Sequence, residues 1–146
     1  NPWAKQLFLG WKELGVTLNG RAVAISDIND INESRVLASR SEIRRGQWDQ
    51  FERFSFDIIP TGSIAYKLSL VSAGLADAVL SLAPKNEWDI AAGIGLVEFA
   101  GGMVTDLDEK MISFNNKDVL CSGLICSTPS LFKDFIDTVK AEESDV

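Results

Sequence analysis

The order of apolar and polar residues predicts a short antiparallel region at the start of the chain. Apolar stretches at 6–12 and 16–18 are followed by a third at 21–25, and Asn19-Gly20 separates the last two. Asn-Gly is a strong signal for a two-residue turn, so these residues predict an antiparallel hairpin. Because a hairpin is only marginally stable alone, we expect residues 1–26 to belong to a larger antiparallel sheet.

From residue 35 onward, the pattern alternates between strand and helix periods. Strands are predicted at 35–39, 56–59 (ended by Pro60), 76–82, 103–107 and 124–127. A first helix is predicted to begin at the Ser41 N-cap, and its exposed face would carry Arg44, Arg45, Asp49 and Glu52. Three further helices are predicted to begin at Gly62-Ser63 (to Gly74), at Glu87 (to Phe99) and at Thr128-Pro129 (to about Lys140). This alternation predicts an α/β domain over 27–146, with a mixed or largely parallel sheet flanked by helices. The acidic residues 141–146 are expected to fray.

Composition and charge restrict the classes of partner. The 146 residues include 21 acidic and 14 basic side chains, for a net charge of −7, so the surface would repel a nucleic-acid polymer. No stretch reaches the roughly 18–20 apolar residues of a membrane span. Cys121 and Cys126 are expected to be reduced, buried thiols, which favours a cytoplasmic location. Histidine is absent, which excludes triads and metal sites that depend on it.

The most informative stretch is Trp88-Asp89-Ile90-Ala91-Ala92-Gly93, which continues to Gly101-Gly102. An aspartate near the start of a helix can cap it and is favoured there by the helix dipole. It can also hold a cation in front of the helix. The residues alone favour the cap, and the small side chains that follow would let the helix pack closely.

This stretch resembles the C-terminal signature of the inositol monophosphatase superfamily. Leu7-Phe8, Gly10 and Leu18-Asn19-Gly20 are similar to the hairpin of that family, and Gly62-Ser63-Ile64 with residues 70–78 is similar to its substrate-side helix and following strand. The resemblance covers essentially the whole chain. It implies the C-terminal portion of the layered α/β sugar-phosphatase fold, together with one hairpin of the N-terminal antiparallel sheet.

The resemblance also implies roles for several residues. The signature aspartate of the family is a magnesium ligand, which implies that role for Asp89 and Mg²⁺ as the cofactor. The start of the substrate-side helix contacts the organic part of the substrate, which implies substrate binding by Gly62, Ser63 and Ile64. The alternative is a plain N-cap serine after a glycine turn. Asp77 recurs in the family and is interpreted as structural, holding a turn or strand end.

Other parts of the family's site are absent from this chain. Its Asp-Pro-x-Asp-Gly-Thr motif, an upstream glutamate and a water-orienting threonine have no counterpart, so no catalytic residue is expected here. Asp27, Asp30 and Glu33 do not imitate that motif and are interpreted as solvated surface. Because Asn1 is followed directly by Pro2 without an initiating Met, we expect part of a longer protein, inactive alone, whose other magnesium ligands lie elsewhere.

Three residues bear on the substrate. Ser81 best matches the glutamate that binds an inositol hydroxyl in one branch of the family. Ser39-Arg40-Ser41-Glu42 resembles the Ser-Arg-Ser-His run of the 3'(2'),5'-bisphosphate nucleotidase branch, and Lys67 falls near a lysine of that branch. Arg40 and Lys67 would then hold a second phosphate. The alternatives are a surface ion pair for Arg40 and a surface lysine with a buried stem for Lys67.

The sequence therefore predicts part of a magnesium-dependent phosphomonoesterase that acts on a small phosphorylated polyol, sugar or nucleotide through metal-activated water. A bisphosphate nucleotidase is the narrower alternative, and a non-catalytic packing or interaction module is the alternative of another class. The resemblance implies a homodimer, and the free edge of the hairpin predicts self-association.

Overall fold

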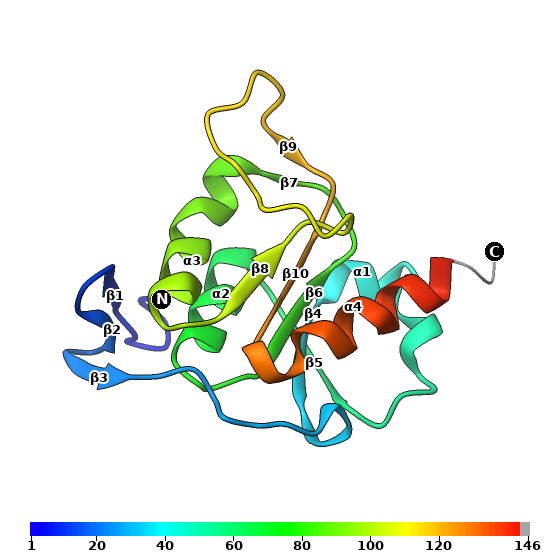
Figure 1. The fold of residues 1–146 in the computed structure, drawn as a ribbon, viewed down its shortest axis with the longest axis horizontal. Coiled ribbons are helices and arrows are strands. Elements are labelled where there is room, and N and C mark those ends of the chain that lie inside the picture. Colours follow the sequence, from blue (N-terminus) through cyan, green and yellow to red (C-terminus); the bar gives the residue numbers. More distant parts are fainter. Residues whose placement is uncertain (144–146) are drawn as a thin grey trace.

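The computed structural model describes residues 1–143, which form a central mixed sheet with helices on both faces and a smaller antiparallel sheet at one side (Figure 1). The central sheet has five strands in the order β5-β4-β6-β10-β8. β4, β5 and β6 run parallel, and β10 is antiparallel to β6 and β8. Their bounds are Arg35–Ser39 (β4), Asp57–Thr61 (β5), Ala78–Ser81 (β6), Met103–Thr105 (β8) and Leu124–Ser127 (β10).

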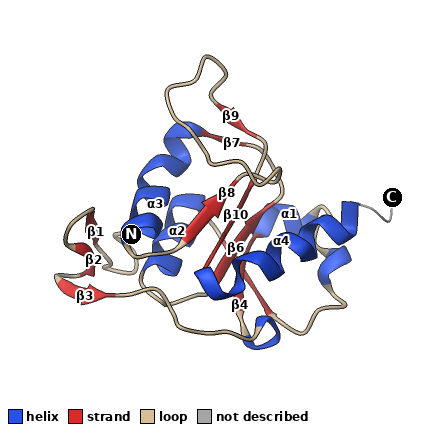
Figure 2. Cartoon of the chain, in the orientation of Figure 1, coloured by secondary structure: helices blue, strands red, loops and turns tan. Residues whose placement is uncertain are grey.

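Alternate strand residues fill two separate cores, one on each face of this sheet. Val36 and Ala38 of β4 join the core formed with α4 (Pro129–Glu143), whereas Leu37 joins the core formed with α2 (Ile64–Ser72) and α3 (Glu87–Phe99). Side chains along a strand point to opposite faces, which explains the division. The predicted mixed α/β sheet, flanked by helices on both sides, is confirmed (Figure 2).

The smaller sheet contains the predicted hairpin. β1 (Phe8–Trp11), β2 (Gly15–Leu18) and β3 (Arg21–Val23) pair antiparallel in that order. Asn19 and Gly20 both have positive φ, as the predicted two-residue turn requires. The sheet lies against α3, and Gly10 allows this approach because a β-carbon there would lie 2.8 Å from Leu96.

Two element predictions are wrong, and one element was not predicted. Pro60 lies inside β5 and does not end it, because β5 is an edge strand where a missing N–H costs no ladder bond. The helix expected from the Ser41 cap is only the single turn α1 (Arg40–Arg44), followed by a 3₁₀ turn at Asp49–Phe51. A two-stranded ribbon of β7 (Lys85–Asn86) and β9 (Leu120–Cys121) was not expected.

The end of the last helix also differs from its prediction. α4 continues to Glu143, so the frayed tail expected from 141 does not begin there, and residues 144–146 lie outside the described residues. Among the described residues, no helix combines the length and apolar character that crossing a bilayer requires. Cys126 is buried and Cys121 half-buried, both are free thiols, and burial raises the pKa of each.

Candidate functional site

Three helices begin at the same edge of the central sheet. α1 follows the carboxyl end of β4 directly, α2 begins three residues after β5, and α3 follows β6 after a short loop. β4, β5 and β6 are parallel, so their carboxyl ends lie at one edge. Crevices at such edges are the usual ligand sites of open α/β sheets. This topology gathers the starts of the three helices and the residues expected to bind substrate.

The start of α2 is strained and closely packed. Ser63 is the N-cap, its hydroxyl accepts a hydrogen bond from the Tyr66 backbone N–H at 3.3 Å, and its φ is +62°. The expected N-cap role is confirmed, and a positive φ in a residue with a β-carbon stores strain of the kind often found at ligand sites. Ile64 is the first residue of the helix and packs against the core beneath it.

Arg40 lies against Gly62. A β-carbon at Gly62 would lie 2.5 Å from the Arg40 Nη2 atom, so the glycine makes room for the guanidinium. Arg40 is exposed, and no ion pair joins it to a described residue, so the surface ion pair considered for it is not found. Arg40, Gly62 and Ser63 line an open groove of about 810 Å³, together with residues of the N-terminal segment that include Trp3 and Phe8.

Lys67 is buried, with only 1% of its surface exposed, so the interpretation as a surface lysine is wrong. The Nζ atom has no hydrogen-bond partner among the described residues. The pKa of Lys67 is lowered to about 8: burial is the largest cause, the negative charge of Glu42 opposes it, and the Lys85 ammonium adds to it. Burial of an amine destabilises its charged form, which explains the direction.

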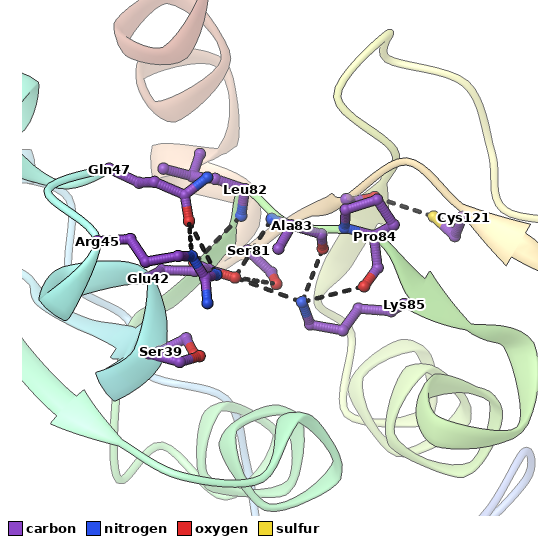
Figure 3. A network of polar contacts seen from close by, with 12 residues as sticks. Ser39, Glu42, Arg45, Gln47, Ser81, Leu82, Ala83, Pro84, Lys85 and Cys121 are labelled. Carbon is purple, nitrogen blue, oxygen red and sulfur yellow. Dashed lines mark hydrogen bonds and ion pairs between the residues drawn. The ribbon is translucent and has the colours of Figure 1, made fainter.

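Ser81 is fully buried at the end of β6 and donates a hydrogen bond to Glu42 Oε1 at 3.2 Å. Glu42 is also fully buried and accepts further hydrogen bonds from the loop after β6 (Figure 3). The sequence had indicated Glu42 only as a departure from a histidine position. Its burial was not predicted, because glutamate is rarely buried without partners and those partners are distant in sequence.

Asp89 lies in the first turn of α3, and its side chain is exposed. The helix N-cap is Asn86, and no side-chain hydrogen bond caps this end, so the cap interpretation of Asp89 is wrong. Its carboxylate has no hydrogen bond or ion pair to any described residue. The Asp89 carboxylate is therefore open to a cation. One turn further on, α3 packs closely on α2, because a β-carbon on Gly93 would lie only 2.7 Å from Leu68.

The remaining acidic residues have other roles. Asp77 is fully buried and accepts hydrogen bonds from Ser26 and Arg35, which confirms its structural role. Asp27, Asp30 and Glu33 are exposed, and Asp30 caps a 3₁₀ turn at Ile31–Glu33. Among residues 1–143, no group of three or more His, Cys, Asp or Glu side chains is placed to hold a metal ion.

The fold and this edge define a layered α/β protein with a crevice-type site, and comparisons with known proteins identify its family. The model of the inositol monophosphatase family matches residues 1–143, so the chain belongs to that family. An inositol-1-monophosphatase from Synechocystis is 26% identical, with 92% of this chain and 52% of the relative covered. A protein named Nus factor SuhB from Xylella fastidiosa is 32% identical, with 73% and 41% covered.

Solved structures of the family show the same fold. An inositol monophosphatase from Thermotoga maritima superposes with a TM-score of 0.84 at 23% identity, covering 99% of this chain and 55% of that one. An inositol monophosphatase from Anabaena gives a TM-score of 0.81 at 22% identity, with 96% and 56% covered. The chain thus spans about half the length of the relatives that it matches.

Proposed function

We propose that this chain supplies the substrate side of a magnesium-dependent phosphomonoesterase that acts on a small phosphorylated polyol, sugar or nucleotide. The observation that carries the proposal is the common sheet edge where α1, α2 and α3 begin. That edge brings a groove lined by Arg40, Gly62 and Ser63 together with the helix that presents Asp89. A guanidinium and free helix N–H groups both favour an anionic ligand.

Asp89 would hold one coordination position of Mg²⁺. Its exposed carboxylate has no hydrogen bond or ion pair to residues 1–143 and fits a single oxygen ligand. Magnesium prefers near-octahedral oxygen coordination, and one carboxylate rarely suffices, so the other protein ligands would come from outside residues 1–143. When bound, the metal supplies water activation and stabilisation of the leaving oxygen. The groove residues Gly62, Ser63 and Ile64 would hold and orient the organic part of the substrate.

A 3'(2'),5'-bisphosphate nucleotidase is the narrower form of this proposal. Arg40 is exposed and lies directly beside the start of α2, where a guanidinium suits a substrate with a second phosphate. Lys67, the other cation that the resemblance implies, is buried and is not among the residues that line this groove. The Ser81 hydroxyl is fully buried and already donates to Glu42, and it lacks the negative charge of the glutamate that binds an inositol hydroxyl, which argues against an inositol-specific site.

The test is magnesium-dependent phosphate release by the full-length gene product, offered inositol 1-phosphate and 3'-phosphoadenosine 5'-phosphate in parallel. Asp89→Asn should lower kcat/KM by roughly 100-fold with the preferred substrate, because it removes a metal ligand. The matched control is Glu98→Gln, an exposed change on the same helix. No magnesium-dependent release from either substrate would overturn the proposal, and full activity of Asp89→Asn would remove its metal role.

A non-catalytic interaction module is the second candidate. It is supported by large apolar side chains exposed on and beside the small sheet, among them Trp3, Trp11 and Leu14. Relatives named Nus factor SuhB support roles for the family besides hydrolysis.

The phosphatase proposal also includes partners and location. It implies a small phosphorylated substrate, no nucleic-acid polymer and no membrane as partners, a homodimer, and the cytoplasm as the location. The net charge of −7 and the two free thiols support it.

A further inference from the structure

A second groove adjoins the substrate groove at α1. Its volume is about 410 Å³, and it is lined by Arg40, Ile43, Arg44 and Pro60. Arg40 and Pro60 also line the groove of about 810 Å³ at the start of α2. Because the two grooves share these residues, a ligand that extends past Arg40 would lie in both.

The only charged side chains that line the second groove are the two arginines. Arg40 and Arg44 are four positions apart on α1, so they lie on the same face of that helix. Both are exposed, and neither guanidinium forms an ion pair with a residue in the described range 1–143. Like charges at this spacing destabilise a helix, and an anion bound between them would remove that repulsion.

The acidic residue of α1 does not neutralise these arginines. Glu42 is fully buried, and its carboxylate accepts five hydrogen bonds of 3.2–3.3 Å from Trp48 and from the Ser81–Lys85 loop (Figure 3). Its oxygen atoms are therefore occupied on the inner side of the helix. The same hydrogen bonds hold this single turn against the sheet, so Arg40 and Arg44 extend from a fixed element.

The rest of the second groove is apolar. Ile43 is half-buried, and Pro60 is exposed on the edge strand β5. Arg40 separates the two grooves, because its guanidinium lies over Gly62, where a β-carbon would be 2.5 Å from Nη2 and 3.3 Å from Cζ. An apolar surface between two guanidiniums suits the carbon part of a ligand that carries an anionic group, since guanidiniums bind phosphate and also stack on planar rings.

We propose that the groove lined by Arg40 and Arg44 is a second anion subsite, which binds the phosphate that stays on the product. Arg44 is then a specificity-determining residue. The inference rests on the proposed function and names its substrate class: small molecules that carry two phosphate groups on one organic framework. The organic part of such a substrate lies on Ile43 and Pro60, and Arg44 selects it over a related molecule with one phosphate.

The first experiment measures binding without hydrolysis. Isothermal titration calorimetry of the full-length gene product in EDTA would compare 3'-phosphoadenosine 5'-phosphate with adenosine 3'-phosphate and adenosine 5'-phosphate. The bisphosphate should bind most tightly, and Arg44→Gln should weaken its binding about tenfold, the effect of losing one charge-assisted contact. The matched control is Arg45→Gln, because Arg45 is exposed on the next position, bonds to Gln47 and does not line the groove.

Three results of this titration would overturn the inference. They are the absence of bisphosphate binding by the unaltered protein, equal affinity for all three nucleotides, and an affinity for the bisphosphate that Arg44→Gln leaves unchanged. Equal weakening by Arg45→Gln would also overturn it, since the effect would then come from net charge and not from this groove.

The second experiment separates the subsite from the proposed activity. With Mg²⁺ present, Arg44→Gln should lower the ratio of kcat/KM for the bisphosphate to kcat/KM for adenosine 3'-phosphate about tenfold. Arg44→Lys should restore part of this ratio, because it keeps the charge but loses the two-pronged geometry. Hydrolysis with a ratio that Arg44→Gln leaves unchanged supports the phosphatase and overturns the subsite. If no substrate is hydrolysed but bisphosphate binding depends on Arg44, the proposed function fails and the subsite stands.

Discussion

Asp77 shows how a single buried carboxylate can join three segments of this chain. It accepts hydrogen bonds from Ser26 Oγ at 2.6 Å, from the Arg35 backbone N–H at 2.7 Å and from the Arg35 guanidinium at 2.9 Å. Burial raises the pKa of Asp77, but the hydrogen bonds from Arg35 and Ser26 outweigh burial and leave it below its ordinary value. A lowered folded-state pKa means that ionisation favours folding.

Asp77→Asn should therefore lower the free energy of unfolding by about 3 kcal/mol at neutral pH, since it leaves buried donors without a charged acceptor. The contribution of ionised Asp77 to the free energy of unfolding is complete above the unfolded-state pKa of about 3.9. It is lost as the pH falls through the lower folded-state pKa. Urea denaturation at pH 7 and at successively lower pH measures this, with the exposed Asp27→Asn as control. A constant difference between the proteins down to acidic pH would contradict the assignment.

Sequence reasoning reached some residues of the site and missed others for a physical reason. The Ser63 N-cap and the place of Asp89 in the first turn of a helix were accessible because a helix start depends on local residues, although the cap role that those residues favoured for Asp89 is wrong. Glu42 was not accessible, because its partners in the Ser81–Lys85 loop are 39 to 43 positions away. The burial of Lys67 was missed for the same reason, since it depends on how α2 packs in the folded chain.

At the scale of elements, the close packing of α2 on α3 fixes the helix that carries Asp89 against the helix that begins at the groove. Gly93 permits this approach, because a β-carbon would lie 2.7 Å from Leu68, whereas one on Gly95 would meet only Phe99 at 3.7 Å. Gly93→Ala should lower the free energy of unfolding by about 1–3 kcal/mol through overpacking. Gly95→Ala on the same helix should raise it by about 0.5–1 kcal/mol, through helix propensity.

Chemical denaturation of both glycine variants measures the contrast between them. Equal stabilities would mean that α3 does not rely on contact at Gly93. A loss of magnesium-dependent activity in Gly93→Ala, with activity kept in Gly95→Ala, would further link the α2–α3 contact to the position of Asp89.

Element types were predictable from the period of apolar residues, but some boundaries were not. The strands at 35–39 and 124–127 have the predicted bounds, because they are buried and bounded by polar residues. The strand at Pro60 continued past its expected end because β5 lies at the sheet edge, and sheet order is a tertiary property. The β7–β9 ribbon joins residues more than thirty positions apart, and each strand is only two residues long, so no local pattern indicated it.

At the scale of the whole molecule, the central sheet and the small sheet differ in how well their surfaces are covered. The central sheet is packed on both faces. On and beside the small sheet, large apolar side chains are exposed: Trp3 at 96%, Leu14 at 77%, Leu7 at 59%, Trp11 at 50% and Leu9 at 41%. Among the described residues, the outer edge of β1 pairs with no other strand. Apolar surface and a free strand edge in one place favour association with another chain.

The 146-residue chain is therefore expected to self-associate in solution. Sedimentation velocity over a range of concentrations should show a sedimentation coefficient that rises with concentration. The double variant Trp11→Ser/Leu14→Ser should shift the chain toward the monomer, because it removes apolar area from this surface without touching the core. Trp88→Ser, an exposed change on α3, is the matched control and should leave association unchanged. A coefficient that stays at the monomer value at all concentrations would show that the small sheet is soluble as it stands, and would weaken the interaction-module alternative with it.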